Sequence, residues 1–178
     1  MRRPGIAHLF PATAAAALVL TLSACGGGSS GDGGAEEVSG ADLRAHVEKS
    51  FTPDDGVELE ISCPEPLAAE KDATATCTVK DGESQTGVRF TTTSVEGDEV
   101  SFDALPFLTG ETVGATLTQE LGNQGFAVDS MKCPDALDGT KGATTECAVT
   151  SQGQDGTIAV EVTDVDGLRI GFNWEVRK

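Results

Sequence analysis

The sequence predicts an α+β fold in two tandem units, each with one N-terminal helix packed on a four-stranded antiparallel sheet and closed by one disulfide. The first observation is an internal repeat: at an offset of 70 residues, Cys63-Pro64 recurs as Cys133-Pro134 and Cys77 recurs as Cys147. The second is a change of apolar period within each copy, from every fourth residue to every second, which is typical of a helix followed by strands. A repeat of this length indicates a domain rather than one turn of a solenoid.

Each copy begins with a predicted helix whose apolar residues form one stripe. In the first copy Ser39 can cap a helix over residues 41–50, because its hydroxyl oxygen can accept a hydrogen bond from an early backbone N–H. In the second copy Gly122 is expected to end the helix. The stripe comprises Leu43, Val47 and Phe51 in the first copy and Val113, Leu117 and Leu121 in the second.

Four short strands are expected after the first helix, because apolar and polar residues alternate there. Turns with Asp-Gly or Glu-Gly separate the runs at Asp81-Gly82 and Glu96-Gly97, and Asp166-Gly167 marks the matching hairpin of the second copy. A helix covering the apolar face of such a sheet gives an α+β unit of about 65 residues, whose core alone is marginal. The apolar strand positions are Val57, Leu59, Ile61, Cys63, Ala75, Cys77, Val79, Val88, Phe90, Val100 and Phe102.

The two α+β repeats are predicted at residues 41–104 and 110–178, joined by an apolar linker at 105–109. Within the linker, Phe107-Leu108 is expected to pack between the units. The alternative is that the linker extends the last strand of the first unit. Pro106 limits this alternative, because proline cannot donate a hydrogen bond to a neighbouring strand.

The first 24 residues have the layout of an export signal. Two arginines precede a largely apolar run over residues 6–22, which is the charged-then-apolar pattern of a secretory signal. The segment ends in Leu22-Ser23-Ala24-Cys25 and resembles a bacterial lipoprotein signal. The resemblance implies that Cys25 is acylated with a fatty acid such as palmitate and holds the protein at the extracytoplasmic face of the cell membrane. An ordinary signal peptide or a spanning anchor is the alternative, although the glycines after Cys25 disfavour a spanning helix.

Residues 25–40 are rich in glycine and serine and are expected to form a flexible tether, with residues 1–24 as the signal peptide.

The other four cysteines are expected to form disulfides, because an exported chain meets an oxidising environment. Three connectivities exist, and the equal spacing favours Cys63 with Cys77 and Cys133 with Cys147. A zinc site is the alternative, but it would need closer cysteines or nearby histidines, so we expect no metal and no cofactor.

These residues together resemble an actinobacterial family of exported domains known as domain of unknown function 4333. The resemblance rests on a short helix, a Cys-Pro pair, a loop, a second cysteine that opens a strand, and an Asp-Gly or Glu-Gly hairpin. Both copies match, and the matches cover most of residues 40–176. The resemblance implies a cell-envelope location and an α+β fold, and it implies no activity.

The composition disfavours several functions. The chain has 29 Asp and Glu against 12 Lys and Arg, a net charge of −17, so it lacks the positive charge that neutralises nucleic-acid phosphates. His46, at the border of the apolar stripe, is expected to be a half-buried packing residue rather than a ligand or a base. Asp164-Val165-Asp166-Gly167 has the start of a calcium loop without its remaining acids, which favours a plain hairpin turn. We therefore expect the protein not to be an enzyme.

The leading functional expectation is a lipid-anchored, non-catalytic binding or structural module of the cell envelope, with an envelope or extracellular protein as partner. The alternative is a secreted-type inhibitor of an extracellular enzyme, since tandem helix-and-sheet repeats with one disulfide each are architecturally similar to β-lactamase inhibitory proteins. An unrecognised hydrolase is a remote third. Phe172 and Trp174 share one face of the last strand, where they either pack under the second helix, which is favoured, or form an exposed binding patch.

Overall fold

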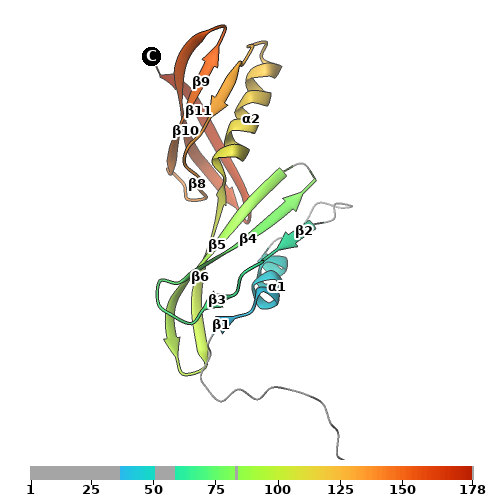
Figure 1. Ribbon diagram of the computed structural model, residues 1–178, viewed down its shortest axis with the longest axis vertical. Coiled ribbons are helices and arrows are strands. Elements are labelled where there is room, and N and C mark those ends of the chain that lie inside the picture. Colours follow the sequence, from blue (N-terminus) through green and yellow to red (C-terminus); the bar gives the residue numbers. More distant parts are fainter. Residues whose placement is uncertain (1–36, 51–58, 83, 178) are drawn as a thin grey trace, which may run out of the picture. The chain divides into compact units, whose positions relative to one another are not determined.

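A computed structural model describes the protein at residues 37–50, 59–82 and 84–177 (Figure 1). Within these ranges the chain is α+β, with two helices and antiparallel strand pairs. The predicted signal peptide, Cys25 and most of the predicted tether lie outside the described residues, as do Phe51 and Val57. No helix in the described ranges is long and apolar enough to span a membrane.

The two helices begin at matching positions of the repeat. α1 (Gly40–Ser50) follows Ser39, whose hydroxyl oxygen accepts a hydrogen bond from the backbone N–H three residues later at 3.2 Å. α2 (Gly110–Asn123) follows Thr109, whose hydroxyl oxygen accepts the equivalent bond at 3.1 Å. Each cap satisfies a backbone donor that has no partner inside its helix. The predicted cap of the first helix is therefore confirmed.

The end of α2 differs from the prediction at Gly122. The helix continues to Asn123, and the N–H of Gln124 still bonds to the carbonyl oxygen of Glu120 at 3.1 Å. The chain leaves the helix at Gly125, whose φ of +87° is a left-handed conformation that favours glycine. Gly122 therefore lies inside the last turn, and Gly125 ends the helix.

The first sheet has five strands rather than the predicted four. Its order is β2-β4-β5-β6-β8, with every neighbouring pair antiparallel. The fifth strand, β8, comes from the second copy and pairs with the last two residues of β6. The strands are β2 (Leu59–Ser62), β4 (Thr74–Asp81), β5 (Ser84–Glu96), β6 (Glu99–Leu108) and β8 (Leu137–Asp138).

The second sheet has the predicted four strands, in the antiparallel order β11-β10-β9-β7. A separate pair joins β1 (Glu37–Val38) to β3 (Leu67–Ala68), so the predicted tether gives way to a strand before residue 40. This pair matches the β6–β8 pair at the offset of 70, because Val38↔Leu67 corresponds to Leu108↔Leu137. The strands are β7 (Ser130–Lys132), β9 (Thr144–Ser151), β10 (Gln154–Asp166) and β11 (Arg169–Arg177).

The predicted linker, residues 105–109, is not a separate segment, because residues 105–108 are the end of β6. Pro106 is accepted within the strand because its carbonyl oxygen accepts a hydrogen bond from the Gly139 N–H at 2.7 Å, on the side away from β5. The missing N–H of the proline faces that same side, so the pairing with β5 loses no donor. Phe107 packs on Gly87 of β5, and Leu108 enters the second core.

Each copy has its own hydrophobic core, beneath its helix. The buried residues of the first core are Leu43, Val47, Ile61, Leu67, Ala75, Cys77, Val79, Val88, Phe90 and Leu168. Those of the second are Leu108, Val113, Leu117, Leu121, Leu137, Cys147, Ile158, Val160 and Val162. The described stripe residues of both helices are all buried, as predicted, while Leu168 of the second copy belongs to the first core.

Candidate binding groove

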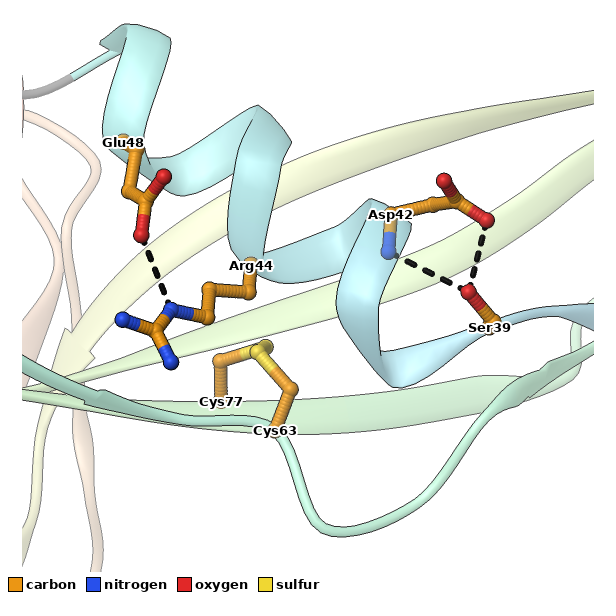
Figure 2. The surroundings of a disulfide bond; sticks show 6 residues. All are labelled: Ser39, Asp42, Arg44, Glu48, Cys63 and Cys77. Carbon is orange, nitrogen blue, oxygen red and sulfur yellow. Dashed lines mark hydrogen bonds and ion pairs between the residues drawn. A yellow bond between two sulfur atoms is a disulfide. The ribbon is translucent and has the colours of Figure 1, made fainter.

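The disulfides join the end of one strand to the next long strand in each copy. Cys63 pairs with Cys77 and Cys133 pairs with Cys147, which confirms the predicted connectivity (Figure 2). Cys77 and Cys147 are completely buried, and the first cysteine of each pair is half-buried under the helix N-terminus. Each disulfide therefore links the helix-facing loop to the centre of the sheet.

A glycine at the start of each helix lets the helix approach this loop. A Cβ atom on Gly40 would collide with the carbonyl oxygen of Cys63, and a Cβ atom on Gly110 would collide with that of Cys133. These contacts are with backbone atoms, which cannot move aside as a flexible side chain can. The two glycines thus set how closely each helix lies on its disulfide.

A groove runs beside the second helix, between α2 and the edge strand β7. We name it the α2–β7 groove and define it by its lining, with a volume of about 900 Å³. The strand wall consists of residues 128–134, in which Val128, Met131 and Cys133 are half-buried. The helix wall consists of Gly110, Glu111, Gly114, Ala115, Thr118 and Gln119.

The helix wall of this groove has mainly small side chains, which protrude little into it. Gly114 is buried, and a Cβ atom there would lie 3.4 Å from Met131 Cγ and 3.6 Å from Cys133 Sγ. Thr118, one turn further along, folds its hydroxyl back onto the helix and donates to the Gly114 carbonyl oxygen at 2.8 Å. The α2 side of the groove therefore leaves space above the half-buried sulfur of Cys133.

The first copy has a long charged side chain at the same place. Arg44 stands where the second copy has Gly114, and its Nε donates to Glu48 Oε1 at 2.8 Å. Figure 2 shows the Arg44 side chain leaving α1 on the side of the Cys63–Cys77 bond and turning toward Glu48. The two copies thus differ at this helix position: an ion pair occupies it in the first copy, and a glycine that lines the groove occupies it in the second.

The predicted site residues lie elsewhere. Phe172 and Trp174 are half-buried against the second core, and the Trp174 indole N–H donates to Glu120 Oε2 at 2.8 Å. They therefore occupy the packing position that the sequence favoured for them. His46 is exposed rather than half-buried, and its ring lies nearly perpendicular to the rings of Phe90 and Phe102, with centroid distances of 5.8 and 5.2 Å.

The groove was missed from the sequence, although a signal for it was present. The repeat was identified from pairs that match at the offset of 70, whereas the groove arises from pairs that differ, Arg44 with Gly114 and Glu48 with Thr118. A third differing residue is Phe126, which is 57% exposed and lies two positions before the strand wall. In a duplicated chain, a charged residue replaced by glycine on a helix face indicates a change of surface rather than of fold.

The comparisons with known proteins agree with the duplication. A family model described as a domain of unknown function (DUF4333) matches residues 19–97 and matches again at residues 103–167. Each match contains one complete disulfide. No curated protein and no solved structure matches the chain.

Proposed function

The chain belongs to the DUF4333 family, with two tandem copies of this domain of unknown function, and we propose that it is a non-catalytic binding protein of the cell envelope. A lipid on Cys25 holds it at the extracytoplasmic face of the membrane, and the α2–β7 groove receives part of an envelope or extracellular protein. The lipoprotein-like sequence at residues 22–25 supports the anchor. The geometry of the second copy supports the binding role.

One observation carries the binding role: in the second copy a groove lies beside Gly114, whereas in the first copy the ion pair between Arg44 and Glu48 stands at the equivalent helix positions. Packing does not require the opening, since the first copy folds with Arg44 and Glu48 at the same helix positions. A concave site with an apolar floor and few polar groups is the usual form of a binding site. The second copy has this form at Gly114, where the first copy has an ion pair.

The described cysteines have structural roles, which supports a non-catalytic function. All four described cysteines are in disulfides, so none offers a thiolate. A cysteine nucleophile of the hydrolase type would need one of these sulfur atoms to be a free thiol.

A second candidate, inhibition of an extracellular enzyme, is favoured by one observation. Phe126 is the most exposed aromatic side chain among the described residues, at 57%, and it follows α2 directly. Exposed aromatic side chains commonly anchor tight protein interfaces. An inhibitor would therefore use Phe126 together with the end of α2.

In-cell photocrosslinking tests the proposed site. A photoreactive amino acid at Ala115, on the helix wall, should capture a partner in intact cells, and the same residue at Ala45, its equivalent in α1, is the matched control. We expect a crosslinked product from position 115 and none from position 45. Equal yields at both positions, or no product at 115, would contradict the groove as the binding site. A product from position 126 alone would favour the inhibitor.

A further inference from the structure

We propose that the α2–β7 groove binds an extended peptide segment of a partner protein, which adds to the free edge of β7 as an extra strand and carries alternating basic and apolar side chains. This inference rests on the proposed binding function and names its ligand class. The ligand is recognised mainly through its backbone, with selectivity from the groove walls. Strand addition beside a helix is an established mode of peptide recognition.

The first argument is the position of β7 in its sheet. β7 is the terminal strand of the order β11-β10-β9-β7, and β9 is its one strand neighbour. In a strand, successive backbone groups point to alternate edges, so an edge strand has N–H and C=O groups with no strand partner. Here residues 128–134 form one wall of the groove along that edge. A peptide lying in the groove is therefore placed beside backbone groups that can pair with its own.

The second argument is size. The helix wall extends from Gly110 to Gln119, which corresponds to about 14 Å at the helical rise of about 1.5 Å per residue. The strand wall extends from Val128 to Pro134, about 20 Å at about 3.3 Å per residue. A groove of this length and of about 900 Å³ accommodates an extended segment of about four to six residues.

The third argument is the chemistry of the walls. The strand wall offers half-buried apolar surface from Val128, Met131 and Cys133. This surface lies next to Gly114, which has no side chain to cover it. Alternate side chains of an extended peptide point to the same side. Every second residue of the peptide can thus place an apolar side chain against this surface, while the residues between face solvent.

The fourth argument is charge. Two exposed acids, Glu111 and Asp129, line the groove, against one base, Lys132, and one carboxylate oxygen of Asp129 also accepts a hydrogen bond from the Gly153 N–H at 3.0 Å. The second copy as a whole has 11 acids and 5 bases over residues 110–178, so its surface attracts cations. Basic side chains at the solvent-facing positions of the peptide complement this negatively charged surface. The first copy instead has Arg44 at the equivalent of Gly114, and the side chain, paired with Glu48, occupies that position.

Fluorescence polarisation with synthetic peptides tests the inference on the detergent-solubilised full chain. The probe is a labelled hexapeptide of alternating lysine and valine, and we expect saturable binding to the wild type. Gly114→Arg, which copies the first repeat, should weaken binding at least tenfold. Gly122→Arg adds the same charge to the same helix, at a site where a Cβ atom meets nothing within 4 Å, and should change affinity less than twofold.

A backbone-modified probe separates strand addition from simple charge attraction. The same hexapeptide N-methylated at every backbone amide keeps its side chains but has no backbone N–H to donate to β7 from either edge, and it should bind at least tenfold more weakly. A hexapeptide of alternating glutamate and valine should not bind. Hydrogen exchange of the β7 amides, residues 130–132, should slow on addition of the lysine–valine peptide.

Three results would overturn the inference: equal binding by Gly114→Arg and wild type, equal binding of the methylated and unmethylated peptides, or no binding of the lysine–valine peptide. These results are distinct from failure of the proposed function. If position 115 still captures a partner in cells while the peptide does not bind, the groove is a binding site for another class of ligand. If neither occurs, both proposals are wrong.

Discussion

Replacing Leu168 by alanine should destabilise the first copy, although the residue belongs to the second. Leu168 lies in the turn between β10 and β11, where the first copy has Asp98. It is only 8% exposed and is a member of the first core, together with Val47 and Val88. The side chain therefore links the stability of the two copies, and its truncation removes apolar contacts from the first.

The size of the effect follows from burial and from the surrounding space. Burying a leucine side chain contributes about 1.5–3 kcal/mol, and Leu→Ala substitutions in cores cost about 2–5 kcal/mol, more where a sealed cavity remains. Leu168 already lines a cavity of about 310 Å³, whose lining also includes the exposed Ser50 and Asp103, so truncation enlarges a space that water can enter. We therefore expect a loss of about 2–3 kcal/mol in the free energy of unfolding, a large share of the about 5–15 kcal/mol typical of a domain.

Hydrogen exchange monitored by mass spectrometry locates the effect. In Leu168→Ala, amides of residues 43–47 and 88–92 should exchange faster, at a rate set by the lost stability. The control is Val165→Ala on the same hairpin, where the side chain is 36% exposed and the change should stay within about 0.5 kcal/mol. Unchanged exchange at residues 43–47 and 88–92, with faster exchange confined to the hairpin itself, would refute the reasoning.

Two further predictions concern the anchor and the helix start. Cys25→Ala should move the protein from the membrane fraction to the medium or leave uncleaved precursor. Mass spectrometry of the wild-type N-terminus should find an acylated Cys25. An unmodified cysteine would contradict the lipid assignment. Gly110→Ala should lower the free energy of unfolding by about 1–3 kcal/mol, because the new Cβ meets backbone at Cys133. Gly122→Ala, where the new Cβ atom meets nothing within 4 Å, should raise the free energy of unfolding by about 0.5–1 kcal/mol in denaturant titrations. Equal effects of the two substitutions would contradict the idea that α2 needs a glycine at its start to approach Cys133.

Much of each unit could be predicted because local patterns determine it. Leu43 and Val47, four residues apart, and their counterparts Val113 and Leu117 are buried, since a helix on a sheet hides one face. The cysteine pairs follow from equal spacing, because a spacing of 14 residues in both copies admits the same hairpin geometry. These features depend on residues close in sequence or on comparison of the two copies.

What could not be predicted depends on where backbone groups point and on contacts distant in sequence. Pro106 disfavours a strand as a residue type, but its missing donor faces away from β5, a direction that the sequence does not show. Leu168 looks like an ordinary turn residue, and only the packing of β10–β11 places it in the first core. The groove at Gly114 depends on the absence of a side chain, which a search for functional residue types does not detect.

The two copies differ in how the centre of each sheet is packed. Opposite Phe90 the first copy has Ala104, while opposite Val160 the second has Trp174, so a large residue faces a small one in both sheets. Ala104 and Leu168 both line the cavity of the first copy. Trp174 packs on the second core, and its indole N–H donates a hydrogen bond to Glu120. The core of the first copy thus includes Leu168 from the second copy, whereas the core of the second copy is covered by its own Trp174. The core of the second copy is therefore packed without Gly114, which instead lines the groove at a position where the first copy has Arg44.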